Sequence, residues 1–186
     1  MAKPLQQEYD PNPVPSNLDD LPRFLFEELE RIKTALYAQP VAMTVILNET
    51  ITVSTVPNWQ RLFDTGTPPS WEVPGGNFDP ATGEWTCPQD GLYQHFVDMR
   101  IQPYGTGNKS YYAGIRLWKV PADGGPNEVV EAVDSGVDDF ELAVTLPVQA
   151  FAQAGDIFYC EGTVVHDQFI GDATIDASWQ LNRVSG

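Results

Sequence analysis

The chain has 186 residues, of which 42% are hydrophobic and 11% aromatic, the composition of a globular protein long enough to bury a sizeable core. It carries 26 acidic and 10 basic residues, for a net charge of −16. Binding to nucleic acid or to an anionic membrane needs clustered cations, so this charge argues against both classes of partner.

The acidity is concentrated in the second half of the chain. Between Val120 and Asn182 there are twelve Asp and Glu residues and no Lys or Arg. A solvated surface explains most of this charge, and a calcium site or a surface for a basic partner are the alternatives. The carboxylates considered for calcium are Asp134, Asp138, Asp139 and Glu141. Their spacing is not that of a calcium-binding loop, so we predict neither a metal nor another cofactor.

The compartment is inferred from what the sequence lacks. No apolar run approaches the roughly 20 residues of a membrane-spanning helix, and the N-terminus has no apolar signal-peptide core. We therefore expect synthesis in a cytoplasm. Cys87 and Cys160 are too few for a disulfide scaffold, so we expect free, buried thiols. Both cysteines fall in predicted strands, which leaves a disulfide between them open.

Residues 1–17 predict an extended arm. Four prolines lie there among polar residues, and each proline removes a backbone donor and favours extended neighbours. The segment is either a disordered tail or an arm that docks on another protein, with Tyr9 and Val14 as candidate anchors.

Leu21–Tyr37 predicts a helix. Pro22 fits only its first turn, and Asp19 or Asp20 can cap it. Its apolar residues follow three- and four-residue spacing: Leu25, Leu29, Ile32 and Leu36. About two heptads are too few to decide between a trimeric coiled coil, packing on the chain's own domain and docking on a partner. We assign residues 1–40 to one attachment or trimerisation segment.

From Val41 onward, short β-rich segments alternate with turn residues and no helical pattern occurs, which predicts one β-sandwich domain over residues 41–186. The expected strands are Met43–Leu47, Thr50–Val53, Trp59–Phe63, Glu84–Cys87, Leu92–Ile101, Ile115–Val120, Phe140–Leu146, Ile157–Val165 and Ile175–Leu181.

Asn77–Val97 is the most informative stretch. Asp79–Gly83 has the composition of a tight turn, and a second turn precedes Gly91. The strand that follows has period 2, which places one row on a single face: Tyr93, His95, Val97, Met99 and Ile101.

This stretch resembles the hallmark of the complement C1q globular head, a family allied to the tumour-necrosis-factor jelly rolls. The matching residues are Phe78, Asp79, Thr82, Gly83, Trp85, Cys87, Gly91 and Tyr93, while His95 stands where the family has Phe. The resemblance implies a jelly-roll β-sandwich of about ten strands that assembles as a homotrimer. Tyr93, His95 and Val97 are then candidate trimer contacts, with a core position for His95 as the alternative.

No constellation points to catalysis. His95 and His166 are the only histidines, and no nucleophile–base pattern, phosphate-binding glycine loop or close metal-ligand spacing occurs. His166 is expected in a loop, where it could at best contribute to a metal site or sense pH. We predict that the protein is not an enzyme.

The leading functional hypothesis is a structural virion protein. The proline-rich N-terminus and the helix after it resemble the N-termini of small bacteriophage structural proteins. A trimeric capsid decoration or head-fibre protein would bind the major capsid protein, or another virion protein, through this arm. It would be made in the host cytoplasm and end on the capsid surface. The alternative is a receptor- or glycan-binding fibre tip, which would expose aromatic loop residues: Trp71, Tyr104, Tyr111 and Tyr112.

Overall fold

The computed structural model describes residue 17 and residues 21–37, 41–101, 110–137, 142–167 and 171–185, with the backbone alone for residues 30–37, 110–111, 135–137 and 185. Its internal contacts divide the chain into two compact units, residues 1–40 and 41–186. The first contains the helix α1 (Leu21–Tyr37), which has the predicted bounds. Among the described residues, no helix is long and apolar enough to span a membrane.

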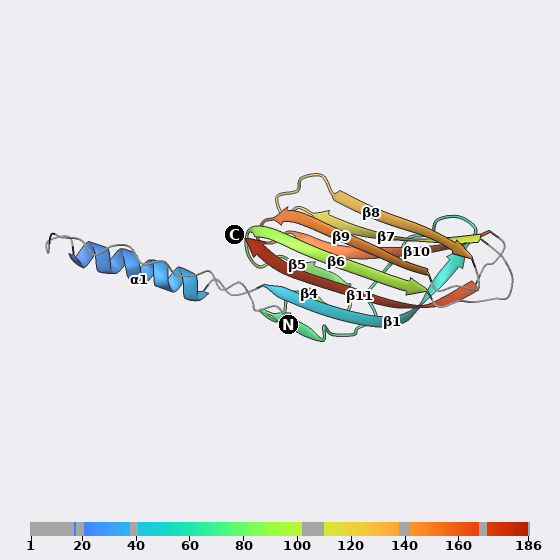
Figure 1. Cartoon of the computed structure of the whole chain (residues 1–186), viewed down its shortest axis with the longest axis horizontal. Helices are drawn as coiled ribbons and strands as arrows, with labels where there is room; N and C mark the ends of the chain where they lie inside the picture. The colour runs from blue at the N-terminus through green and yellow to red at the C-terminus, as the bar shows by residue number, and fades with distance from the viewer. Residues whose placement is uncertain are drawn as a thin grey trace. The chain divides into compact units, whose positions relative to one another are not determined.

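The second unit is a β-sandwich (Figure 1). Its strands are β1 (Ala42–Ser54), β2 (Gln60–Arg61), β3 (Trp71–Val73), β4 (Phe78–Asp79), β5 (Glu84–Thr86), β6 (Gly91–Ile101), β7 (Ser110–Val120), β8 (Glu128–Val137), β9 (Leu142–Ala152), β10 (Ile157–His166) and β11 (Gly171–Ser185). The predicted all-β sandwich with one helix is confirmed.

Two groups of strands form the layers. One has the order β3-β1-β11-β6-β9, and the other places β7 between β10 and β8, with β5 and β2 also pairing with β10. The layers are hydrogen-bonded into one continuous sheet because the end of β1 pairs in parallel with β10, through Val53 with Val164.

Alternating apolar residues fill the space between the layers. The five residues of β6 that were predicted to share one face, from Tyr93 to Ile101, are 0% exposed. Ile175, Ala177, Trp179 and Leu181 of β11 are also buried, as are Leu142, Val144 and Leu146 of β9. Period 2 in each strand accounts for these buried faces; Phe140, the first residue of the predicted strand Phe140–Leu146, lies outside the described residues.

The motif around Gly83 forms the turn between β4 and β5. The Asp79 carbonyl accepts from the Gly83 N–H at 2.8 Å, and the Asp79 carboxylate accepts from the Ala81 N–H at 2.9 Å. Gly83 has φ of +67°, and a Cβ there would lie 2.5 Å from the Leu62 carbonyl oxygen. Only glycine fits, because both the conformation and the space exclude a side chain.

Some predicted strands were wrong in extent, and other strands were not predicted. Met43–Leu47 and Thr50–Val53 are one strand, β1, because the polar pair Asn48-Glu49 stays within the ladder with β11. The strand β8 and the short strands β3 and β4 were not predicted.

Both cysteines are buried and have free thiols. Burial raises the pKa of the Cys87 thiol and the pKa of the Cys160 thiol, which keeps them protonated and slow to react. We expect thiol titration in denaturant, without reductant, to count two thiols per chain. A count of zero would show a disulfide and contradict this.

Candidate functional site

The predicted contact residues of the first unit lie on α1 or outside the described residues. Tyr9 and Val14 are not described, and the side chains of Ile32 and Leu36 are not described either. Leu25 and Leu29 are 50% and 63% exposed, and the neighbouring Phe26 is 66% exposed. These three residues form an apolar stripe that faces solvent, which is unfavourable unless a partner covers it.

The predicted trimer contacts on β6 need correction. Tyr93, His95 and Val97 are 0% exposed in the single chain, so their side chains do not reach a surface that another subunit could contact. The alternative, a core position for His95, is the one that the structure has. Period 2 placed the row on one face but did not say whether that face points inward or toward a neighbouring subunit.

His95 lies in an aromatic cluster. Its ring centroid is 4.6 Å from that of Phe158 and 6.1 Å from that of Trp179. Its Nδ1 accepts a hydrogen bond from the Trp179 indole at 3.3 Å, so the proton of the neutral imidazole is on Nε2. Among the described residues, Nε2 has no hydrogen-bond partner. Burial lowers the pKa of His95 to about 3, so the ring is neutral and is no pH sensor near neutrality.

His166 also lies elsewhere than predicted. It is the last residue of β10, not part of a loop, and it is 4% exposed, with its Nδ1 3.4 Å from Asp167. Among the described residues, no group of three potential metal ligands occurs. Asp134 lies on β8, whereas Asp138, Asp139 and Glu141 are outside the described residues.

The strand β8 exposes apolar side chains that sequence reasoning missed. Val129, Val130 and Val133 are 47%, 44% and 58% exposed. Among the described residues, β8 pairs only with β7, which makes it an edge strand of ten residues. A long apolar edge strand favours association unless something covers it. The sequence pattern that could have predicted this strand is Glu128–Val133, where four apolar residues accompany only two charged ones.

A second, partly apolar feature lies on the outward face of the other layer. The register aligns one row over five strands: Trp71 on β3, Thr44 on β1, Gln180 on β11, Phe96 on β6 and Pro147 on β9. Trp71 is 53% exposed and Ile46, two residues after Thr44, is 61% exposed. We call the five aligned residues Trp71, Thr44, Gln180, Phe96 and Pro147 the outward row.

The aromatic residues that were predicted in loops lie elsewhere. Trp71 lies on a strand, Tyr111 and Tyr112 lie on β7, and Tyr104 is not described.

The outward face of the β10–β7 layer is different because its charges are paired with one another. Arg116 lies 3.7 Å above the Trp59 ring and 2.7 Å from Glu131, and Arg61 lies 3.5 Å above the Tyr159 ring. The Trp118 indole donates to Glu161 at 2.7 Å. A face whose polar groups already have partners is stable in water. The apolar β8 edge and the outward row are therefore the stronger candidates for contact with another molecule.

Comparison with known proteins identifies the fold. No family model matches the chain, and no curated protein matches it. Among solved structures, the globular domain of zebrafish complement 1qA protein is 16% identical with a TM-score of 0.57, over 77% of this chain and 97% of that chain. The Eiger TNF of S. frugiperda is 15% identical with a TM-score of 0.54, over 78% and 93%.

Murine APRIL is 8% identical with a TM-score of 0.53, over 78% of this chain and 98% of that chain. The chain has a C1q/TNF-like jelly-roll fold. The resemblance predicted from Phe78 to Tyr93 is thereby confirmed at the level of the fold. The matched share of the chain, 77–78%, corresponds to about the length of the second unit.

Proposed function

We propose that the protein is a homotrimeric capsid decoration or head-fibre protein, which binds the major capsid protein or another virion protein through residues 1–40. The observation that carries this proposal is the exposed stripe of Leu25, Phe26 and Leu29, on a unit distinct from the jelly roll. In this role the protein is made in the host cytoplasm and resides on the virion surface. It acts as a structural component and not as an enzyme, and it binds neither nucleic acid nor membrane.

Two different surfaces support assembly into a ring. The β8 edge lies in one layer and the outward row in the other, so a contact between the β8 edge of one copy and the outward row of the next is heterologous. Each of the two copies then keeps its other surface for contact with a further copy. Heterologous contacts of this kind close into rings when the rotation allows. Three copies hide three apolar edges and present three arms.

Three arms per assembly strengthen attachment. An arm that becomes ordered only on binding loses conformational entropy, so one copy binds weakly. Linked copies raise the effective concentration of one another, provided that the particle offers sites of three-fold or quasi-three-fold symmetry.

The attachment experiment compares pelleting with undecorated capsids. Full-length protein should pellet, whereas residues 41–186 should stay soluble and folded in the supernatant. A full-length variant with Leu25→Glu and Leu29→Glu should also stay in the supernatant, because charges would replace the apolar stripe. If residues 41–186 pellet as well as the unaltered protein, the jelly roll itself is the contact surface. If only the double-Glu variant pellets, the stripe of Leu25, Phe26 and Leu29 is not the contact.

Val133→Asp is expected to dissociate the trimer without unfolding the chain. The Val133 side chain is 58% exposed in the single subunit, so Asp is tolerated there but would be buried beside a neighbour. Sedimentation velocity should show a monomer. Val56→Asp is the matched control, because Val56 is 64% exposed in the segment between β1 and β2. A Val133→Asp variant that sediments like the control would place the contact elsewhere.

A further inference from the structure

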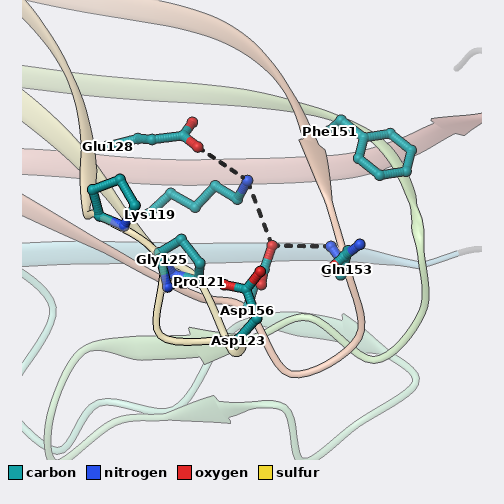
Figure 2. Close-up of a pocket in the computed structure, with 9 residues that line it drawn as sticks. Lys119, Pro121, Asp123, Gly125, Glu128, Phe151, Gln153 and Asp156 are labelled. Atoms are coloured by element: carbon teal, nitrogen blue, oxygen red, sulfur yellow. Dashed lines mark hydrogen bonds and ion pairs between the residues drawn. The ribbon is translucent and has the colours of Figure 1, made fainter.

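A small polar hollow lies between the turn that joins β7 to β8 and the turn that joins β9 to β10 (Figure 2). Its volume is about 290 Å³. This is near the lower limit of small-molecule pockets, which span about 300–1,000 Å³, so it suits a ligand of one ring. The side chains that matter for recognition are Lys119, Asp123, Glu128, Phe151, Gln153 and Asp156.

Asp156 holds the two walls of the hollow together. It is 2% exposed, and its Oδ1 accepts from the Ala122 N–H of one turn at 2.9 Å. Its Oδ2 accepts from the Gln153 N–H of the other turn at 2.9 Å and lies 3.6 Å from Lys119 Nζ. The first turn is fixed further because Asp123 Oδ1 accepts from the Gly125 N–H at 2.9 Å. The hollow is therefore formed before any ligand arrives, which lowers the entropic cost of binding.

The charges in the hollow favour a neutral ligand. Lys119 Nζ lies 3.5 Å from Glu128 and 3.6 Å from Asp156, so a second cation would meet an ammonium group already in place. An anion would meet the carboxylates of Asp123, Glu128 and Asp156. A neutral ligand with several hydroxyl groups avoids both repulsions. Its hydroxyls can donate to the carboxylates of Asp123 and Glu128 and accept from Lys119 or the Gln153 amide.

Phe151 adds an apolar surface at the same place. It belongs to β9 and borders the hollow together with Lys119 of β7, yet it is 60% exposed (Figure 2). The face of an aromatic ring is electron-rich and attracts weakly positive hydrogens. The C–H groups on one side of a sugar ring provide such hydrogens, while its hydroxyls provide both donors and acceptors.

We propose that this hollow is a binding site for a neutral hexopyranose, either a free monosaccharide or a terminal residue of a glycan. Phe151 would stack on the apolar side of the sugar ring. Glu128, Asp123 and Gln153 would bind its hydroxyls, and Lys119 and Asp156 would hold the site in shape. The sugar site does not depend on residues 1–40. Attachment to capsids without sugar binding would contradict only the sugar site, and sugar binding without attachment would contradict only the proposed function.

The test uses the full chain and a panel of D-glucose, D-galactose, D-mannose, L-fucose and N-acetyl-D-glucosamine, with saturation-transfer NMR and calorimetry. At least one sugar should bind in the millimolar range. Phe151→Ala and Gln153→Ala should each weaken that binding about tenfold. Gln153→Ala keeps the backbone N–H that Asp156 accepts from, so the fold is preserved. The matched control is Val56→Ala, because Val56 is also an exposed apolar residue, at 64%, but lies outside the hollow and outside both proposed contact surfaces; this variant should bind sugar like the unaltered protein.

Three results would overturn the proposal. One is the absence of binding by every neutral sugar up to about 50 mM. Another is unchanged affinity in both Phe151→Ala and Gln153→Ala. The third is binding confined to charged probes, such as D-glucosamine or N-acetylneuraminic acid, which would assign the hollow to a different class of ligand.

Discussion

Val97→Asp is expected to abolish folding of the jelly roll. Val97 is 0% exposed and lies in the middle of β6, paired with Trp179 on β11 and Leu146 on β9. The substitution loses about 1.5–3 kcal/mol of apolar burial and leaves a carboxylate without a partner, at a cost of several kcal/mol more. A domain of this size is stable by only about 5–15 kcal/mol.

Urea denaturation followed by circular dichroism measures the effect. The unaltered protein should unfold cooperatively, whereas Val97→Asp should show no folded baseline or be recovered only as aggregate. Val56→Asp introduces the same charge at a position that is 64% exposed and should retain the unaltered midpoint. A soluble, cooperatively unfolding Val97→Asp protein would mean that β6 does not lie in the core.

His95→Phe is expected to remove an acid-sensitive part of the stability. The pKa of His95 is about 3 in the folded protein because of burial, against about 6.5 in the unfolded chain. Because the folded pKa is depressed, this contribution is fully present above pH 6.5 and is lost as the pH falls from 6.5 toward 3. Between pH 7.5 and 4.5 the unaltered protein should lose about 3 kcal/mol relative to the variant.

Glu49 makes the unfolding free energy depend on pH in the opposite direction. Burial, with the nearby Asp64, raises the pKa of Glu49 from 4.5 to about 7, so its contribution is present below pH 4.5 and is lost as the pH rises toward 7. The total pH profile therefore mixes both effects. The difference between the unaltered protein and His95→Phe isolates the histidine, because Glu49 is the same in both.

Urea denaturation at pH 7.5 and at pH 4.5 gives that difference. A comparison of the two proteins at one pH would not isolate the titration of His95, because Phe also removes the hydrogen-bond acceptor of the Trp179 indole. Equal changes in unfolding free energy between the two pH values, in both proteins, would contradict the assignment of His95 to a buried, neutral site.

Much of the fold was accessible from the sequence because its strands follow simple alternation. In β6 every second residue from Tyr93 to Ile101 is apolar or aromatic except His95, and the structure buries all five. The strand β1 was predicted as two segments because Asn48 and Glu49 have the composition of a turn, yet the ladder to β11 continues through both. Tertiary pairing therefore overrode local preference.

The surfaces were harder to predict than the core. Val129 and Val133 lie in an acidic region, and their exposure depends on β8 being an edge strand, which only the strand order determines. The polar hollow depends on Asp156 joining two turns that are more than 25 residues apart in the sequence. The burial of His166 likewise follows from the position of β10 between its neighbours, which the chain's local pattern does not specify.

Sedimentation equilibrium of the purified full-length protein tests the proposed assembly most directly. The chain has a mass of 20.6 kDa, so a closed ring of three copies should behave as a single species of three times that mass at micromolar concentration. Val133→Asp should return the mass to that of one chain. A stable species of one chain mass in the unaltered protein would contradict the trimer, and with it the proposal that three arms attach together.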